Sequence, residues 1–479
     1  MALEMNQKEE VRSSPVEKLP VELLQEVLEC LPDVPSLYAA ILSCSSFHSA
    51  FIGAECAIST AVLFNQIKVE VLPEAMIACD SALLRPHDPN PKSRETILNF
   101  VTCNFLQRPT GHGLWPLWKA LHLGRLHFYV DALAKEFAVS ALSKSPLNQL
   151  NRLPARQESC RIERTLYRFE IYCNIFRENE KRFSSSPSTV LSDRKRLFFD
   201  NFTPYENEQL GCIHDFLIQI VSPSFNEVAE HDVYWGAANV EYDNAIDNGY
   251  VQAVLSRGLE KIYKISRAET YDERYGVLNA NECPHHNRGF LYEGLEEEAN
   301  EPYNDNVYVE DITPVNERLY IKQPFFNDLD RGPMNAWRWA HVEETRSNWV
   351  YQQNRKELRE WGYVLWDQSR LDAVGILHER WEDTVSVRDL VLEQQEAGRE
   401  HAYMQNSWIQ REKVSRAGGS GWWSWGDRSK LKWRTSQTFW NRSGYSRSSP
   451  ELKPTSLQQA REMISSIMLP ASASRYHRS

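Results

Sequence analysis

The sequence predicts a mainly α-helical protein, with an N-terminal block of three short helices followed by a large irregular α-helical domain. Apolar residues recur at helical spacing in several segments. The alternation of apolar and polar residues that is typical of half-buried strands is scarce. We find no repeat of fixed period, so a regular solenoid is not supported.

The first helical block spans residues 17–64, after a polar segment, residues 1–16, that we expect to be disordered. Pro20 suits the first turn of a helix, because its missing N–H needs no partner there. Apolar residues then follow at helical spacing: Leu24, Val27, Leu28 and Leu31. Pro32 ends this helix, because proline cannot donate the next backbone hydrogen bond.

Two more short helices complete the block. Asp33 can cap the second helix, whose inner face carries Leu37 and Ile41. Ser45 or Ser46 can cap the third. Three short helices in roughly 45 residues cannot enclose a large core, since domains this small are marginal. We therefore expect the block to leave an apolar face for a partner or for the rest of the chain.

The next segments also favour helices. Residues 65–93 are expected to hold a helix, at 71–84, and then a proline-rich linker. Residues 94–410 form one large α-helical domain in this interpretation. Its clearest helix has an apolar stripe made of Ile162, Leu166, Phe169, Cys173 and Phe176. Further helical patterns cover residues 205–221, 249–268 and 334–371.

Two segments stand out by charge. Residues 279–311 hold nine acidic residues and one basic residue, which predicts a solvated acidic loop. Residues 411–479 form a basic tail rich in Trp and Ser, in which residues 411–447 hold nine basic and two acidic residues. The sequence favours Trp side chains that anchor this tail onto the domain or the acidic loop. Binding of single-stranded nucleic acid or of an acidic peptide is the alternative.

Composition excludes several classes of protein. The chain has 479 residues and a net charge of −11, which argues against a protein that coats nucleic acid. The nine cysteines are never spaced as Cys-x-x-Cys, which is typical of reduced thiols in an intracellular protein. No secretory signal and no apolar run near the roughly 18 residues of a membrane helix is present. We therefore expect a cytoplasmic or nuclear protein.

No motif for catalysis, metal or cofactor rises above background. Cys283, His285 and His286 lie close together, but no second ligand pair with zinc-like spacing follows. No Gly-x-Gly-x-x-Gly, phosphate-binding loop or Gly-x-Ser-x-Gly turn occurs. We accordingly expect no catalytic residues, no metal and no cofactor.

The segments Leu19-Pro-Val-Glu22, Leu28-Glu-Cys-Leu-Pro32 and Cys44-Ser-Ser-Phe47, with Leu37 between the last two, resemble an F-box in order and spacing. The resemblance covers about a tenth of the chain and is strongest to F-box proteins of filamentous fungi. It implies that the chain docks onto a Skp-family adaptor and through it onto a cullin. The chain would then be the non-catalytic substrate receptor of a ubiquitin ligase, with residues 94–410 as the recognition domain for a protein substrate.

By this resemblance, the adaptor-binding residues are Leu19, Pro20, Leu23, Val27, Leu28, Leu31, Pro32 and Leu37. The alternative is a helical scaffold whose N-terminal helices simply fold onto the core and take no part in ubiquitination. An enzyme with a site in the Trp-rich C-terminal half has no support in the sequence.

Overall fold

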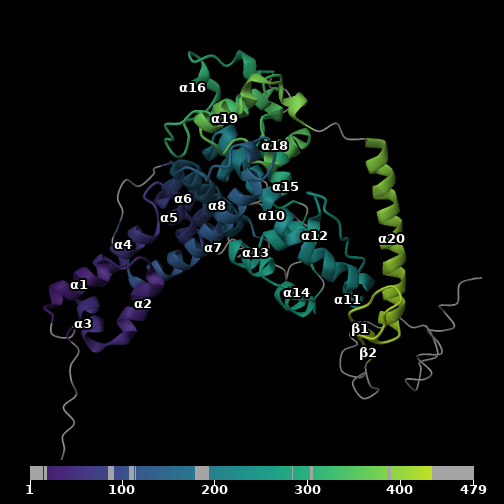
Figure 1. Ribbon diagram of the computed structural model, residues 1–479, viewed down its shortest axis with the longest axis horizontal. Coiled ribbons are helices and arrows are strands. Elements are labelled where there is room, and N and C mark those ends of the chain that lie inside the picture. The colour runs from purple at the N-terminus through teal and green to yellow at the C-terminus, as the bar shows by residue number, and fades with distance from the viewer. Residues whose placement is uncertain are drawn as a thin grey trace, which may run out of the picture. The chain divides into compact units, whose positions relative to one another are not determined.

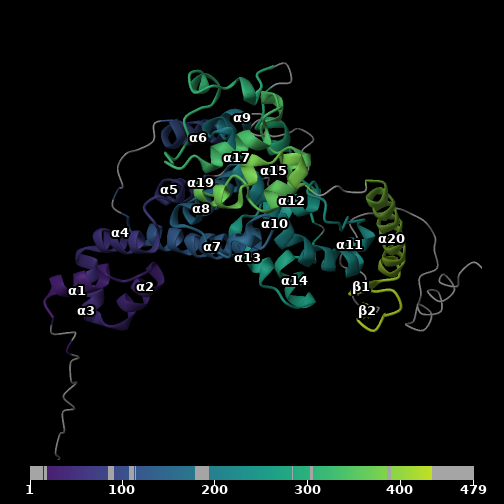
Figure 2. The same cartoon turned by 45° about the horizontal axis from the view of Figure 1, so that its top comes forward.

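The computed structural model describes residues 15, 19–84, 91–106, 113, 115–177, 194–282, 284–287, 289–301, 306–385 and 390–433. The described residues are mainly α-helical, which confirms the predicted fold class, and the sheet they contain is a two-stranded hairpin (Figure 1, Figure 2). They divide into two compact units. Unit 1 comprises Met1–His214, Gly258–Glu260 and Gly294–Glu382, and unit 2 comprises Asp215–Arg257, Lys261–Glu293 and Asp383–Ser479.

Unit 1 holds the N-terminal helices and most of the middle of the chain. Its helices are α1 (Val21–Glu29), α2 (Val34–Ser43), α3 (Ser45–Gly53), α4 (Glu55–Gln66), α5 (Leu72–Ser81), α6 (Pro91–Val101), α7 (Leu117–Leu142), α8 (Arg156–Phe176), α9 (Arg194–Leu197), the first half of α10 (Pro204–His231), α16 (Glu317–Tyr320), α17 (Gly332–Ala340), α18 (Lys356–Glu360) and α19 (Gln368–Val374). Short 3-10 or π turns connect them at Thr102–Leu106, Leu147–Gln149, Phe199–Asn201, Gly294–Glu298, Val309–Asp311, Arg346–Asn348, Gln353–Arg355, Ile376–His378 and Trp381–Thr384.

The helix α8 is the buried centre of unit 1 and packs against α5 and α7. Its predicted apolar stripe, from Ile162 to Phe176, is buried as expected. The opposite face is buried too, although it carries Arg161, Arg164 and Arg168. These guanidinium groups form ion pairs inside the unit, with Glu74, Glu206, Asp328 and Asp367. A helix whose sequence looks amphipathic is therefore buried on all sides from Cys160 to Phe169, because its charged face meets carboxylates of opposite sign.

Unit 2 contains the second half of α10 with a shorter set of helices and the hairpin. These elements are α11 (Val233–Ala237), α12 (Gly249–Leu255), α13 (Leu259–Ser266, from Lys261 on), α14 (Tyr271–Leu278), α15 (Leu291–Glu293), α20 (Leu390–Arg416), β1 (Gly419–Gly421) and β2 (Leu431–Trp433). The strands are antiparallel, and Ser420 pairs with Lys432. Helix α20 packs against α11, where the buried side chain of Arg411 donates to the backbone oxygens of Ala229 and Asp232.

The structure corrects several sequence expectations about local structure. The pattern at 249–268 is two helices, because Gly258 adopts a left-handed conformation (φ +87°) between them. The acidic segment 279–311 is not simply a solvated loop, because Phe290, Leu291 and Leu295 are buried and short helices form there. The helix expected at 71–84 is present as α5.

The expected domain limits also differ from the observed units. Residues 94–410 are shared between both units, and residues 17–64 belong to unit 1. Position 410 lies inside α20, so the basic tail begins as a continuation of a helix and then forms the hairpin. Most of the expected lead-in, the core of the linker at 85–90, Cys283 and the tail beyond Trp433 lie outside the described residues.

In the described part of the chain, no single helix is both long and apolar enough to span a membrane; α3 and α4 reach that length and composition only as a pair bent by 98°.

Candidate functional site

The candidate site is the N-terminal module, which we define as α1–α4 (residues 19–66). Pro20 precedes α1 and occupies its N-cap position. The N-cap of α2 is Asp33, whose Oδ1 accepts a hydrogen bond from the backbone N–H of Ser36 at 2.7 Å, as the sequence predicts. The cap of α3 was predicted wrongly: it is Cys44, whose Sγ accepts from the N–H of Phe47 at 3.5 Å.

The module has a core of its own. Helix α1 packs against α3 and α4, and α2 packs against the same two helices. Fully buried side chains at this core are Leu28, Val34, Leu37, Ala50, Ile58, Val62 and Leu63. Addition of the fourth helix explains how so short a segment encloses these side chains.

Helix α1 presents two different apolar faces. Leu24 and Leu28 point into the module core. Leu23 and Val27 lie four residues apart on α1 and are 44% and 46% exposed, and Leu19, which precedes the helix, is 38% exposed. We call these three residues the α1 stripe. Side chains spaced by four residues lie on one side of a helix, so Leu23 and Val27 form an exposed apolar strip beside the core-facing residues.

The structure separates the predicted adaptor-binding residues into two groups. Leu19, Pro20, Leu23, Val27 and Pro32 are exposed, and Leu31 is half-buried. Leu28 and Leu37 have no exposed surface. These two therefore support the module from inside and cannot touch a partner while the module is folded. Helical spacing alone could not assign Leu28 to the core, because leucines on both faces of α1 satisfy that spacing.

Other exposed apolar side chains on the module were not identified from the sequence. Leu42 on α2 and Ile52 on α3 are 67% and 63% exposed. Each is the direct neighbour of a buried residue, Ile41 and Phe51 respectively. Adjacent residues cannot share one helix face. An apolar residue directly beside a core residue is therefore the sequence feature that indicates an exposed apolar side chain.

The module is fixed to α7 within unit 1. The side chain of Gln66 bridges the two, because its Oε1 accepts from the N–H of Val34 at 3.2 Å and its Nε2 donates to the carbonyl of Gly124 at 3.0 Å. A Cβ at Gly124 would lie 2.9 Å from Gln66 Oε1 and 3.1 Å from Val34 Cβ. A side chain at position 124 would displace Gln66 and press on Val34, so glycine lets α7 approach α2 and α4 this closely.

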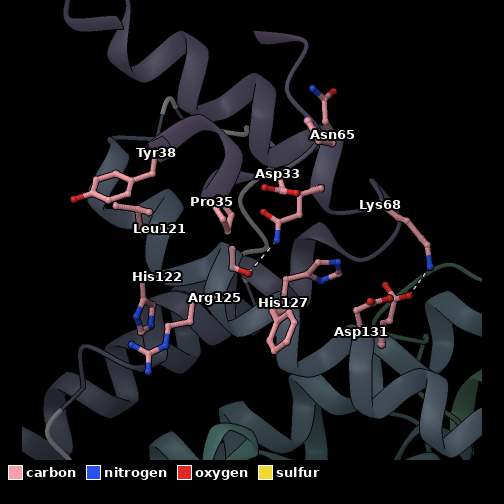
Figure 3. A pocket seen from close by; sticks show the side chains of 15 residues that line it. Asp33, Pro35, Tyr38, Asn65, Lys68, Leu121, His122, Arg125, His127 and Asp131 are labelled. Atoms are coloured by element: carbon pink, nitrogen blue, oxygen red, sulfur yellow. Dashed lines mark hydrogen bonds and ion pairs between the residues drawn. The ribbon is translucent and has the colours of Figure 1, made fainter. Parts of the chain in front are cut away.

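A cavity of about 830 Å³ lies beside this joint, between α2, the end of α4 and α7 (Figure 3). Tyr38 of α2, Leu121 of α7 and Lys68 line it (Figure 3). There Lys68 forms an ion pair with the carboxylate of Glu163, which is only 3% exposed. Burial raises the pKa of Glu163, and the ammonium group of Lys68 opposes that rise.

The imidazole of His127 also lines this cavity and hydrogen-bonds through Nδ1 to the hydroxyl of Tyr167 at 2.9 Å. Burial lowers the pKa of His127 to about 4, so the ring is neutral at physiological pH. Among the residues that the structure describes, no group of three or more His, Cys, Asp or Glu side chains is arranged to hold a metal ion. The cavity lies where the module meets the rest of unit 1.

Comparison of the chain with family models, with curated proteins and with solved structures gives no significant match.

Proposed function

We propose that the chain is the substrate-receptor subunit of a cullin–RING ubiquitin ligase, and that its N-terminal module docks onto a Skp-family adaptor. The observation that carries the proposal is the exposed α1 stripe on a module whose own core is already closed. The motif residues Leu19, Pro20 and Leu23 belong to its exposed side. In this proposal the chain performs no chemistry and works in the cytoplasm or the nucleus.

The docking surface is preorganised in the folded module. Leu23 and Val27 of the stripe lie on a helix that is held in place by Leu24 and Leu28, so no large folding step has to accompany binding. An amphipathic helix with apolar side chains at every fourth position commonly fills a hydrophobic groove of a partner. The partner expected here is accordingly an adaptor with an apolar groove.

The attachment of the module to α7 also fits the role of a receptor. A receptor accelerates ubiquitin transfer only by holding a substrate lysine near the charged ubiquitin carrier. A flexible connection between the module and the rest of the chain would lower the effective concentration of the substrate lysine at the ubiquitin carrier. The Gln66 bridge and the close approach at Gly124 give unit 1 a defined connection to the adaptor-binding face.

One observation favours a second candidate, a helical scaffold outside ubiquitination. The module packs on α7 through both α2 and α4 and is not separated as a unit of its own. A terminal extension of a helical domain would show the same packing. The two candidates differ in what the α1 stripe binds.

Substitution of Val27 by Asp is expected to weaken binding of a Skp-family adaptor roughly 100-fold. The change removes an apolar contact worth about 1.5 kcal/mol and buries a charge in the interface, and each 1.4 kcal/mol is about tenfold in Kd. Isothermal titration of the purified full chain with the adaptor measures the effect. Circular dichroism checks that the variant is folded, as expected for a side chain that is 46% exposed.

The matched control is Val139→Asp. Val139 lies on α7 of the same unit and is 72% exposed, so the same chemical change is made away from the stripe. The control should bind the adaptor like the wild type. Equal affinity of wild type and Val27→Asp, or no binding by the wild type, would remove the ligase proposal and leave the scaffold.

A further inference from the structure

The cavity between α2, the end of α4 and α7 has the size of a ligand site and an apolar wall. Its volume of about 830 Å³ falls within the range that is common for ligand pockets. Pro35 and Tyr38 lie one turn apart on α2, and Leu121 and Phe128 lie two turns apart on α7 (Figure 3). Residues with these spacings share one side of a helix. Both helices therefore turn an apolar side toward the cavity.

Two aromatic rings of this wall are accessible to a ligand. Tyr38 and Phe128 are 46% and 55% exposed, although both line the cavity. The ring of Phe128 meets that of the adjacent Tyr129 edge-on, with 5.5 Å between ring centres. Aromatic rings contact apolar groups and also attract cations. A ligand in the cavity would thus cover apolar surface that now faces solvent.

The polar part of the wall contains a buried carboxylate, that of Glu163 on α8. Its side chain is 3% exposed, and its Oε1 accepts a hydrogen bond from the ammonium group of Lys68. Its Oε2 has no hydrogen-bond partner among the residues that the structure describes. A buried polar atom without a partner costs free energy, and most such atoms in proteins are paired. One oxygen of this carboxylate therefore lacks a donor, which a ligand can supply.

The charge around the cavity favours a donor that is positively charged. Asp33 and Asp131 also line the cavity, so its wall holds three carboxylates and two cations, Lys68 and Arg125. Both cations are already ion-paired. Asp131 meets an exposed lysine one turn along α7, a kind of pair that contributes little. The N-terminal module adds negative charge, because residues 19–66 contain five acidic residues and neither Lys nor Arg.

We propose that this cavity binds a basic peptide segment, with an ammonium or guanidinium group at Glu163 and an apolar side chain against Tyr38 and Phe128. A charge-assisted hydrogen bond is stronger than a neutral one, and the negative wall disfavours acidic segments. The lining residues come from α2, α4, α7, α8 and the turns beside them, so a peptide here leaves the α1 stripe free. The inference therefore does not depend on the adaptor proposal.

The test is fluorescence anisotropy of the full chain with a short labelled peptide in which lysine alternates with leucine. We expect saturable binding that weakens with added salt, because salt screens the attraction between charges. The same peptide with acetylated lysines should bind about tenfold more weakly, because acetylation removes the positive charge.

Glu163→Gln should weaken binding of the lysine peptide about tenfold, because the carboxylate loses its charge and keeps its shape. The matched control is Glu158→Gln on the same helix. Glu158 is 1% exposed and pairs with Arg370, so the same buried change is made outside the cavity. The control should bind the peptide like the wild type, and circular dichroism checks that both variants are folded.

A second pair of variants keeps the test valid if a glutamine variant fails to fold. Phe128→Ala should weaken binding several-fold through loss of the aromatic contact. Its matched control is Trp118→Ala, since Trp118 is an aromatic residue of α7 that is 58% exposed and does not line the cavity. Absence of saturable binding, equal binding of the acetylated peptide, or equal weakening by the variants at positions 128 and 118 would each overturn the inference.

Discussion

Replacement of Arg168 by Met is expected to destabilise unit 1 by about 3–5 kcal/mol, which is the usual cost of leaving a buried charge without its partner. The guanidinium group of Arg168 is 2% exposed. It donates to Glu74 at 3.1 Å and to Glu206 at 2.9 Å. Methionine has a similar length but leaves both carboxylates in the interior without this donor.

The loss should depend on pH. Burial already raises the pKa of Glu74 above its usual 4.5, with Arg168 and then Arg164 opposing the rise. Without Arg168 this pKa rises further. A carboxyl whose pKa is higher in the folded than in the unfolded state costs stability as pH rises through that interval. The destabilisation by Arg168→Met should therefore be smaller at about pH 5 than at about pH 8.

Urea unfolding of wild type and variant at both pH values measures this effect. The matched control is Arg156→Met, on the same helix α8. Arg156 pairs with Glu70, but its side chain is 62% exposed, and exposed ion pairs contribute little to stability. The account is contradicted if the two substitutions shift the unfolding midpoint equally.

The second large effect is expected at Leu28. Leu28→Ala should reduce the local stability of the module by about 3 kcal/mol, since truncation of a buried leucine removes its contacts and leaves a cavity. Leu28 has no exposed surface, whereas the adjacent Val27 is 46% exposed. Val27→Ala should change stability by no more than about 0.5 kcal/mol.

Hydrogen–deuterium exchange of peptides from α1–α4 distinguishes these neighbours, because it reports local opening of a segment. We expect faster exchange in Leu28→Ala and nearly unchanged exchange in Val27→Ala. Equal exchange in the two variants would mean that α1 does not pack as described. Because Leu28 is buried and Val27 is exposed, a charged residue at position 28 would unfold the module, and only a charge at position 27 tests binding through the α1 stripe.

The sequence predicts the helices well where apolar spacing is regular, as in α5, α8 and α10. It does not predict that the charged face of α8 is buried, because the carboxylates that neutralise Arg168 lie far away along the chain, at Glu74 and Glu206. Long-range ion pairs leave no periodic signal. The break at Gly258 was also missed, since the apolar pattern continues on both sides of it.

The candidate site was predicted in part. Helical spacing and the leucine–proline motif locate the module, but spacing alone cannot say which side of α1 faces the core. Leu28 and Leu37 were placed in the predicted contact, and the structure places them inside. The decisive information is the packing of α3 and α4 on α1, which depends on contacts between separate helices.

The most direct test of the central claim uses a native cysteine as a reporter. Cys30 follows α1 and is exposed, three residues after Val27, so it lies on the side of the α1 stripe. Cys103 is also exposed and serves as an internal control outside the module. The measurement is the rate of alkylation of each thiol in the full chain, by mass spectrometry, with and without a Skp-family adaptor. We predict that the adaptor slows alkylation of Cys30 and leaves that of Cys103 unchanged; a saturating adaptor that leaves Cys30 as reactive as before would contradict docking through this face.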